Sequence, residues 1–445
     1  MTTSIGTPEL LGPRSIRSIW AAFWRSDLTR RFASGVTWSM ISAASAQGGT
    51  IISGVIAARL LGRSSFGELA IVQGTVGTVA VFGSLALALT TTKHVAEYRH
   101  TAPDRAGRIV ALSTAMTAGS ATLFSLALLL FSGQLATVLH AAHLKVEFEI
   151  SVITLFFSSL SATQTGVLAG LEAFKETTFI NFSRGLISTV SLVLGTILGG
   201  LRGAVYATAL AAFITWLVCQ IVIWAQLKRF GIHSTPQGMF QEVETLWKFS
   251  LPACLSGITV GPIIWLLSSM LARQSGGYAE LGTFNAADRL RLVLMFAPTC
   301  MANASMPMMT SLESCQLFPQ SRQFMRAQIF GTAIIVAAPA AGLFFAAPYI
   351  MTIFGNGYAL GATALRFLAL SAIPMALNTV LGQVMLARGL AWGRFGFDAL
   401  LASLLVLTGC SLLPHFRADG LAAAYLIAYT TGTSALVLKC RRLIR

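Results

Sequence analysis

Four polar side chains interrupt one otherwise apolar stretch of the sequence, residues 281–302. They are Asn285, Asp288, Arg289 and Arg291. At about 100° per residue, the four fall on one side of a helix. A charged side chain inside a bilayer costs roughly 2.5–3.5 kcal/mol on insertion scales, so such a cluster indicates a functional site. The chemistry it predicts is anion binding, because the planar guanidinium of arginine matches the oxygens of a phosphate.

Two interpretations of this cluster remain open. In the first, Arg289 or Arg291 faces a water-filled cavity and holds an anionic group. In the second, Asp288 and Arg291 form a pair at i,i+3 that only locks two helices, which still leaves one arginine without a local partner. Arg289 lies about eight residues in from Leu281, hence about 12 Å deep. Either interpretation therefore places a charge near the bilayer midplane.

Two further arginines, Arg59 and Arg273, occupy matched positions at the ends of the apolar stretches 32–58 and 249–272. They could guide an anionic head group at the outer mouth of the same cavity, or their side chains could simply reach the membrane interface. With the four residues above, they complete the candidate substrate site. We expect no catalytic residue and no metal site.

The composition defines the class of protein. Hydrophobic residues make up 55% of the 445 residues and charged residues only 11%, against about 25% charged residues in a soluble domain. Basic residues in cytoplasmic loops explain the net charge of +15 better than nucleic-acid binding does. The six cysteines lack the paired spacing of a zinc site or disulfide framework. We therefore predict an all-α polytopic membrane protein.

Runs of about 20 apolar residues are long enough to span the hydrocarbon core, and twelve such runs occur. Their approximate bounds are 32–58, 68–91, 109–131, 149–171, 179–199, 203–227, 249–272, 281–302, 328–348, 361–386, 395–413 and 420–438. They divide the chain into a basic N-terminal segment 1–31, a six-helix half 32–230, a linker 231–248 and a second six-helix half 249–445.

Lysine and arginine collect in alternate connections between these runs. Twenty-two of the 31 lie at the two termini and in the even-numbered loops, and seven lie in the odd-numbered loops; the other two are Arg289 and Arg291. Because cytoplasmic loops carry the excess of basic residues, we expect a multi-pass protein of the cytoplasmic (inner) membrane with both termini and the linker in the cytoplasm.

Short motifs repeat between the two halves. Ala58-Arg59, Phe66-Gly67-Glu68-Leu69 and Gly203-Ala204 are echoed by Ala272-Arg273, Tyr278-Ala279-Glu280-Leu281 and Gly420-Leu421, at offsets of 214, 212 and 217. Six spans per half make this a parallel repeat, with a pseudo-two-fold axis along the membrane normal and a central substrate cavity between the two bundles. At the offset of 212, Arg289 corresponds to Gly77 and Arg291 to Val79. Only one half carries the charges.

Several catalytic motifs are absent from the sequence. No Gly-Lys dipeptide occurs, which excludes a phosphate-binding P-loop, and neither His-Glu-x-x-His nor Gly-x-Ser-x-Gly is present. His140 and His143, followed by Glu147 and Glu149, offer ligands for a divalent metal, although a short solvated loop explains them as well. We therefore expect no cofactor and no enzymatic activity.

Three groups of motifs carry a resemblance to a known family. They are Ala57-Ala58-Arg59-Leu60-Leu61-Gly62 with Phe66-Gly67-Glu68-Leu69 and Thr90-Thr91-Thr92-Lys93; Gly282-Thr283-Phe284-Asn285-Ala286-Ala287; and Phe354-Gly355-Asn356-Gly357-Tyr358. The sequence resembles bacterial polysaccharide flippases, the O-antigen and teichoic-acid exporter group of the multidrug/oligosaccharidyl-lipid/polysaccharide exporter superfamily. The resemblance extends over nearly the whole chain, but its motifs indicate the family more than the substrate.

The resemblance implies that the chain moves an undecaprenyl-pyrophosphate-linked oligosaccharide across the cytoplasmic membrane by alternating access. The expected partners are this lipid, the membrane lipids, a polysaccharide polymerase and a chain-length regulator, with H⁺ or Na⁺ as a coupling ion and no nucleic acid. Two alternatives remain. A cation-coupled multidrug exporter needs buried carboxylates, for which Asp288 and Asp398 are available, and a sugar-chain polymerase or ligase would need a large outer loop, which is missing.

Overall fold

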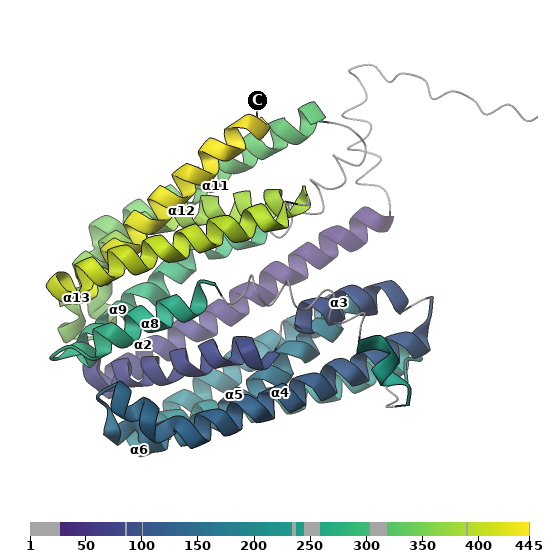
Figure 1. The fold of residues 1–445 in the computed structure, drawn as a ribbon, viewed down its shortest axis with the longest axis horizontal. Coiled ribbons are helices and arrows are strands. Elements are labelled where there is room, and N and C mark those ends of the chain that lie inside the picture. Colours follow the sequence, from purple (N-terminus) through teal and green to yellow (C-terminus); the bar gives the residue numbers. More distant parts are fainter. Residues whose placement is uncertain are drawn as a thin grey trace, which may run out of the picture.

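The structure is a computed structural model, and it describes residues 27–84, 87–99, 101–233, 237–243, 259–302, 318–388 and 390–444. These ranges form helices and turns and contain no strand (Figure 1). Seven helices in them are long and apolar enough to cross a membrane, and three of these seven are 38 to 56 residues long. A bilayer needs only about 20 residues per crossing, so the longest helices contain two spans each.

The first six spans form one bundle, which we call the N-half (residues 27–233). Its helices are α2 (Asp27–Ser84), α3 (Leu87–Tyr98), α4 (Pro103–Val138), η1 (Ala142–Leu144), α5 (Lys145–Gly170) and α6 (Phe174–Arg229). Two of them turn back at a glycine: α2 at Gly62, with φ 74°, and α6 at Gly200, with φ 56°. Glycine suits these turns because positive φ values cost side chains with a Cβ about 1–2 kcal/mol.

The remaining spans form the second bundle, the C-half (residues 259–444), after a short helix of the linker, η2 (Met239–Glu242). Its helices are α8 (Gly261–Ala272), α9 (Gly277–Leu294), α11 (Phe318–Met351), η3 (Thr352–Phe354), η4 (Asn356–Gly361), α12 (Ala362–Ala387) and α13 (Ala391–Ile444). α13 turns back at Arg417, with φ 50°. The two-bundle architecture with about twelve spans is confirmed. The predicted boundary of the second half, at residue 249, lies outside the described residues and stays a prediction.

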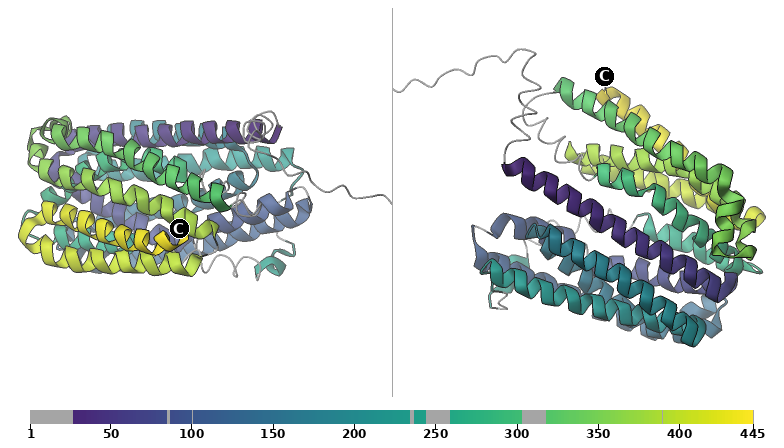
Figure 2. Two further views of the ribbon diagram at one scale, coloured as in Figure 1. Left: turned by 90° about the horizontal axis from the view of Figure 1, so that it is seen from above. Right: turned by 180° about the vertical axis from the view of Figure 1, so that it is seen from behind.

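The turns at Gly62, Gly200 and Arg417 lie at one end of the molecule, which we call the turn face. The C-terminus and η2 lie at the other end, the linker face, as the views in Figures 1 and 2 agree. The helices of the two halves are close together at the turn face and diverge toward the linker face (Figure 1). Large apolar side chains are exposed on the outside, among them Leu198 and Trp392, as expected of a surface that contacts lipid.

The packing reveals the pseudo-symmetry of the two halves. A Cβ on Gly67 of α2 would collide with the carbonyl oxygen of Tyr278, and a Cβ on Gly282 of α9 would collide with that of Arg63. The two glycines lie in a reciprocal contact, so they are equivalent at an offset of 215. The repeated sequence motif gave an offset of 212, which is three residues less than the offset in the structure. The motif matches similar residue types and not the glycines that the close approach of two backbones requires.

The second repeat offset is the same in the sequence and in the structure. Gly203 packs against the carbonyl oxygen of Gly195 within α6, and Gly420 packs against that of Leu412 within α13. The second pair is offset from the first by 217 residues at both positions. The last two spans of each half therefore pack in the same way, and positions in one half can be compared with positions in the other.

Candidate functional site

Arg289 of α9 reaches from the C-half to the N-half. Its Nη1 donates a hydrogen bond to the carbonyl oxygen of Thr50, over 2.8 Å, and its guanidinium lies 5.4 Å from the centre of the Phe66 ring. Gly54 leaves room for it, because a Cβ there would lie 2.5 Å from Nη1. Thr50 is 12 residues from the turn at Gly62, or about 18 Å along the helix. The charge thus lies away from the turn, at the interface of the halves.

Arg291, two positions further on, points into the C-half instead. Its Nε donates to Asp288 Oδ1 over 2.7 Å, its side chain is only 4% exposed, and its guanidinium lies 5.5 Å from the centre of the Tyr425 ring. A sulfur acceptor, Met375 Sδ, is also in contact with it. The Asp288–Arg291 pair of the second interpretation is therefore present. Of the two arginines, Arg289 is the one without a carboxylate partner among the described residues.

The other three candidate residues make separate contacts: Asn285 lies one turn from Arg289 on α9, and Arg59 and Arg273 lie further away. Asn285 donates through Nδ2 to the carbonyl oxygen of Leu281 in its own helix, over 2.9 Å. Arg59 donates to the carbonyl oxygen of Ile353 in the other half, over 2.6 Å. Arg273 is exposed in the turn between α8 and α9. Arg59 and Arg273 thus lie near the turn face. By helix rise, Arg59 is nine residues, about 14 Å, from Thr50, and Arg289 is twelve residues, about 18 Å, from Gly277, where α9 begins after the turn that holds Arg273.

The turn face holds contacts that sequence reasoning missed. Arg63 donates to Thr283 Oγ1 over 3.0 Å and lies 3.7 Å from Glu280 Oε1, both in the C-half. The hydroxyl of Tyr358 donates to the carbonyl oxygen of Ala58, over 3.2 Å. Thr283 and Tyr358 belong to the motifs that carry the family resemblance, but those motifs gave no sign that the two residues contact the other half. These contacts join the halves at the turn face.

Tyr278 extends this contact to the connection between α4 and α5. Its hydroxyl donates to the carbonyl oxygen of Leu139 over 3.1 Å, and its ring meets the ring of His143 edge to face. Burial, together with the nearby Glu68 carboxylate, raises the pKa of Tyr278 to about 12. The phenol therefore stays protonated at neutral pH and remains a hydrogen-bond donor.

The histidine and glutamate side chains weighed as metal ligands have other partners. His143 Nε2 lies 3.0 Å from Glu68 Oε1, and Arg202 Nε donates to Glu147 Oε1 over 3.0 Å. Within the described ranges, no group of three or more His, Cys, Asp or Glu side chains converges as metal ligands would. The side chains at the connection between α4 and α5 form ion pairs instead.

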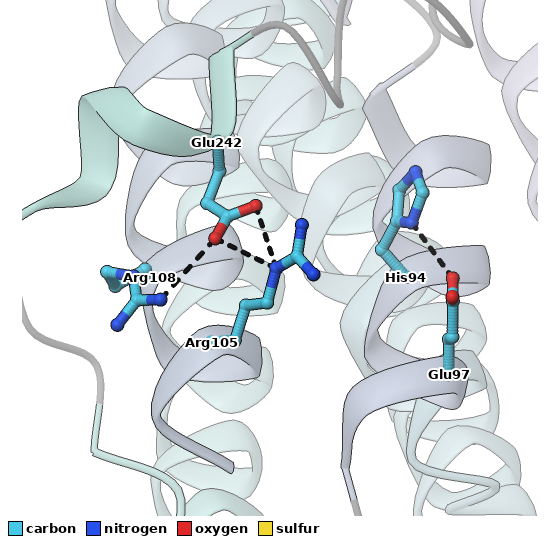
Figure 3. A network of polar contacts seen from close by, with 5 residues as sticks. All are labelled: His94, Glu97, Arg105, Arg108 and Glu242. Atoms are coloured by element: carbon cyan, nitrogen blue, oxygen red, sulfur yellow. Dashed lines mark hydrogen bonds and ion pairs between the residues drawn. The ribbon is translucent and has the colours of Figure 1, made fainter. Parts of the chain in front are cut away.

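The linker is held against the N-half by an ionic contact (Figure 3). Arg105 Nε lies 3.0 and 3.1 Å from the two carboxylate oxygens of Glu242, and Arg108 Nη2 lies 3.5 Å from one of them. Glu242 is 4% exposed, and its neighbours Met239 and Val243 pack beside Ile109 of α4. The segment that joins the halves is thus anchored to the start of α4.

The sequence was compared with known families and proteins. The profile of a family described as "Polysaccharide biosynthesis protein" matches residues 32–313, more than half of the chain. The chain belongs to this family. The "EPS I polysaccharide export inner membrane protein EpsE" of Ralstonia nicotianae is 24% identical over 159 residues, 36% of either chain, and that of Ralstonia solanacearum is 24% identical over 190 residues, 42% of this chain and 44% of the relative. The matches thus span less than half the length of these relatives.

Solved structures of transporters share the fold. An inward-facing multidrug resistance MATE family transporter of the MOP superfamily superposes with a TM-score of 0.74 at 14% identity, over 90% of this chain and 94% of its own. A MOP superfamily transporter from Pyrococcus furiosus gives a TM-score of 0.69 at 16% identity, over 95% and 97%. The chain is therefore a multi-pass membrane protein with the fold of the MOP transporters.

Proposed function

We propose that this polysaccharide biosynthesis protein flips an undecaprenyl-pyrophosphate-linked oligosaccharide from the cytoplasmic to the outer leaflet of the cytoplasmic membrane. The observation that carries the proposal is the guanidinium of Arg289, which lies deep between the two halves and has no carboxylate partner among the described residues. One of its five N–H donors is used by Thr50, so others remain for the oxygens of a pyrophosphate.

The remaining candidate residues take supporting roles in this proposal. Asp288 and Arg291 neutralise each other within the C-half and fix the part of α9 from which Arg289 projects. Asn285 lies one turn nearer the turn face on α9, where a sugar could reach it. Arg59 and Arg273 would receive the anionic group near the outer surface. The substrate would thus pass a series of positive charges.

Alternating access would open and close the two faces in turn. The contacts of Arg63, Tyr278 and Tyr358 described above join the halves at the turn face, whereas the helices diverge toward the linker face (Figure 1). We assign the linker face to the cytoplasm, because the basic residues near it, such as Arg105 and Lys228, follow the positive-inside pattern. In this assignment the structure has its outer gate closed.

The geometry favours this function over cation-coupled drug export. Such an exporter needs buried carboxylates that can exchange protons or Na⁺, and the two that the sequence offers are both paired with arginine. Asp288 binds Arg291, and Asp398 Oδ1 lies 2.6 Å from Arg394 Nη2. A coupling ion, a polysaccharide polymerase and a chain-length regulator are proposed partners that follow from the family.

Binding of undecaprenyl pyrophosphate to the purified protein in nanodiscs tests the role of Arg289. The variant Arg289→Ala should bind at least tenfold more weakly, because hydrogen bonds to a charged group contribute about 1.5–3 kcal/mol. The control is Arg366→Ala, which removes an arginine that donates to the carbonyl oxygen of Phe344 and should bind as the native chain does. Equal affinity of Arg289→Ala and the native chain would overturn the site.

A further inference from the structure

A cavity of about 400 Å³ lies inside the N-half, between the second, fourth and sixth spans. Its volume falls in the range of small-molecule pockets, about 300–1,000 Å³. The lining residues are Leu69, Val72, Gln73, Val76, Gly77 and Ala80 of α2, Ser151, Thr154, Ser158, Ser159 and Ala162 of α5, and Thr208 of α6. None of them is charged.

The pseudo-symmetry explains why there is space at this place. At the offset of 215, Val76 is the counterpart of Arg291, and at the offset of 217, Thr208 is the counterpart of Tyr425. In the C-half, the guanidinium of Arg291 lies against the ring of Tyr425 and fills the region between the spans. In the N-half, the shorter valine and threonine leave that region to a cavity. The two halves thus differ at equivalent positions. In the C-half the position is occupied by a charged side chain, and in the N-half uncharged side chains border a cavity.

Four of the five hydroxyl groups in the cavity wall donate back to their own helices, and the fifth, Thr154 Oγ1, is buried without a hydrogen-bond partner in the described part of the structure. Ser151 and Ser159 donate to the carbonyl oxygens of Phe148 and Leu155, both over 2.8 Å. Thr208 donates in the same way to Val205 over 2.8 Å. The protons of these hydroxyls are therefore used, and the polar groups left for a ligand are Thr154 and the amide of Gln73. The rest of the wall is leucine, valine, alanine and glycine, which suits an apolar ligand better than a sugar.

The cavity overlaps the level of Arg289 along the helices. Val72 and Gln73 are 10 and 11 residues beyond Gly62, about 15–17 Å along the helix, and Thr50, which binds Arg289, is 12 residues before it, about 18 Å. The same helix also links the two sites, because Phe66, over which the guanidinium lies, precedes Leu69 of the cavity by one turn. A molecule with its anion at Arg289 could place an apolar neighbouring part in the cavity.

We infer that the N-half cavity binds the isoprenoid units next to the pyrophosphate of the lipid-linked substrate. This inference rests on the proposed function and makes it more specific. The C-half supplies the charge for the head group, and the N-half supplies an uncharged pocket for the branched chain. The protein would thereby distinguish a polyprenyl pyrophosphate from phospholipids with straight acyl chains.

The test uses undecaprenyl pyrophosphate without sugar that carries a photoreactive diazirine in its first isoprene units. Irradiation in nanodiscs should label peptides that contain residues 69–80 or 151–162. The variant Gly77→Phe would place a ring at the cavity wall, where a Cβ meets no atom within 4 Å, and should reduce this labelling at least fivefold. Thr208→Tyr, which introduces the ring that the C-half has at Tyr425, should have the same effect.

The matched control is Gly119→Phe, at another exposed glycine of the N-half where a Cβ meets no atom within 4 Å. It should leave the labelling unchanged. Labelling that persists in both cavity variants, or that never falls on these two segments, would overturn the inference. Cavity variants that impair movement of the sugar-bearing lipid but keep the isoprenoid labelling would also overturn it and assign the cavity to the sugar. A native chain that is labelled as expected but moves no lipid-linked saccharide would contradict the proposed function and support the pocket.

Discussion

Arg289 and Arg291 are two positions apart on α9, about 200° around the helix. Their side chains therefore point in different directions and have different neighbours. Arg291 has a carboxylate and an aromatic ring as neighbours inside the C-half. Arg289 faces the first span of the other half, where Gly54 leaves room for the guanidinium. The position available for a ligand is thus created by a glycine on one half and an arginine on the other.

Replacing Gly54 should displace the guanidinium without removing it. In Gly54→Leu the new side chain would occupy the place of Arg289 Nη1, so we expect at least tenfold weaker binding of undecaprenyl pyrophosphate with little change in the melting temperature. The control on the same helix is Gly48→Leu, since a Cβ at Gly48 meets no atom within 4 Å. Normal binding by Gly54→Leu would show that the position of Arg289 does not matter.

The sequence was sufficient to identify the charged cluster, because the cost of a membrane-embedded charge follows from residue type alone. It could not decide which arginine pairs with Asp288 and which reaches the other half. That choice depends on where the backbones of α2 and α9 approach, at Gly67 and Gly282. The local pattern contains no information on such a contact between distant segments.

At the scale of the elements, the tight turns decide how the spans are joined. Hydropathy located the twelve spans, but it placed a connection of several residues at 59–67, where the structure has a helical turn interrupted only at Gly62. A single residue in the left-handed region reverses the chain without a polar loop. Such a turn leaves almost no signal in composition, so the predicted boundary was several residues away.

Gly62→Ala should destabilise the fold and leave the binding site intact. At φ 74° a Cβ costs about 1–2 kcal/mol, so we expect a lower melting temperature in thermal unfolding and an unchanged affinity for undecaprenyl pyrophosphate. Gly119→Ala, inside the helix α4, serves as the control and should not lower the melting temperature. An unchanged melting temperature of Gly62→Ala would contradict the role given to this turn.

The anchoring of the linker can be tested in the same way. Glu242→Gln keeps the shape of the side chain but removes the charge that holds it between Arg105 and Arg108. We expect amide hydrogen exchange of residues 239–243 to become at least tenfold faster, since charge-assisted hydrogen bonds contribute about 1.5–3 kcal/mol. Glu172→Gln, at an exposed ion pair with Arg99, should not change exchange in the linker. Exchange that stays slow in Glu242→Gln would show that apolar packing alone holds it.

At the scale of the whole molecule, the reciprocal contact of Gly67 and Gly282 allows the two halves to meet at the turn face. A side chain at either position would collide with backbone atoms of the other half, and backbone cannot move aside as a flexible side chain can. Together with the ionic contacts of Arg63, these glycines form the closed gate of the proposed transport cycle. The same close approach fixes the distance from Arg289 to the N-half.

Gly67→Leu should therefore keep the turn face open. We expect spin labels on the turn-face ends of the two halves to report a longer distance by pulsed electron paramagnetic resonance than in the native chain. Transport should be lost, because the gate cannot close. Gly119→Leu should give the native distance, and a native distance in Gly67→Leu would contradict the gate.

Translocation in proteoliposomes tests the central claim most directly. Fluorescent undecaprenyl-pyrophosphate oligosaccharide is added to one leaflet, and its appearance in the other is followed for the native chain, Arg289→Ala and Arg366→Ala. The account predicts movement with the native chain and Arg366→Ala, and at least tenfold slower movement with Arg289→Ala. No movement with the native chain, or undiminished movement with Arg289→Ala, would contradict it.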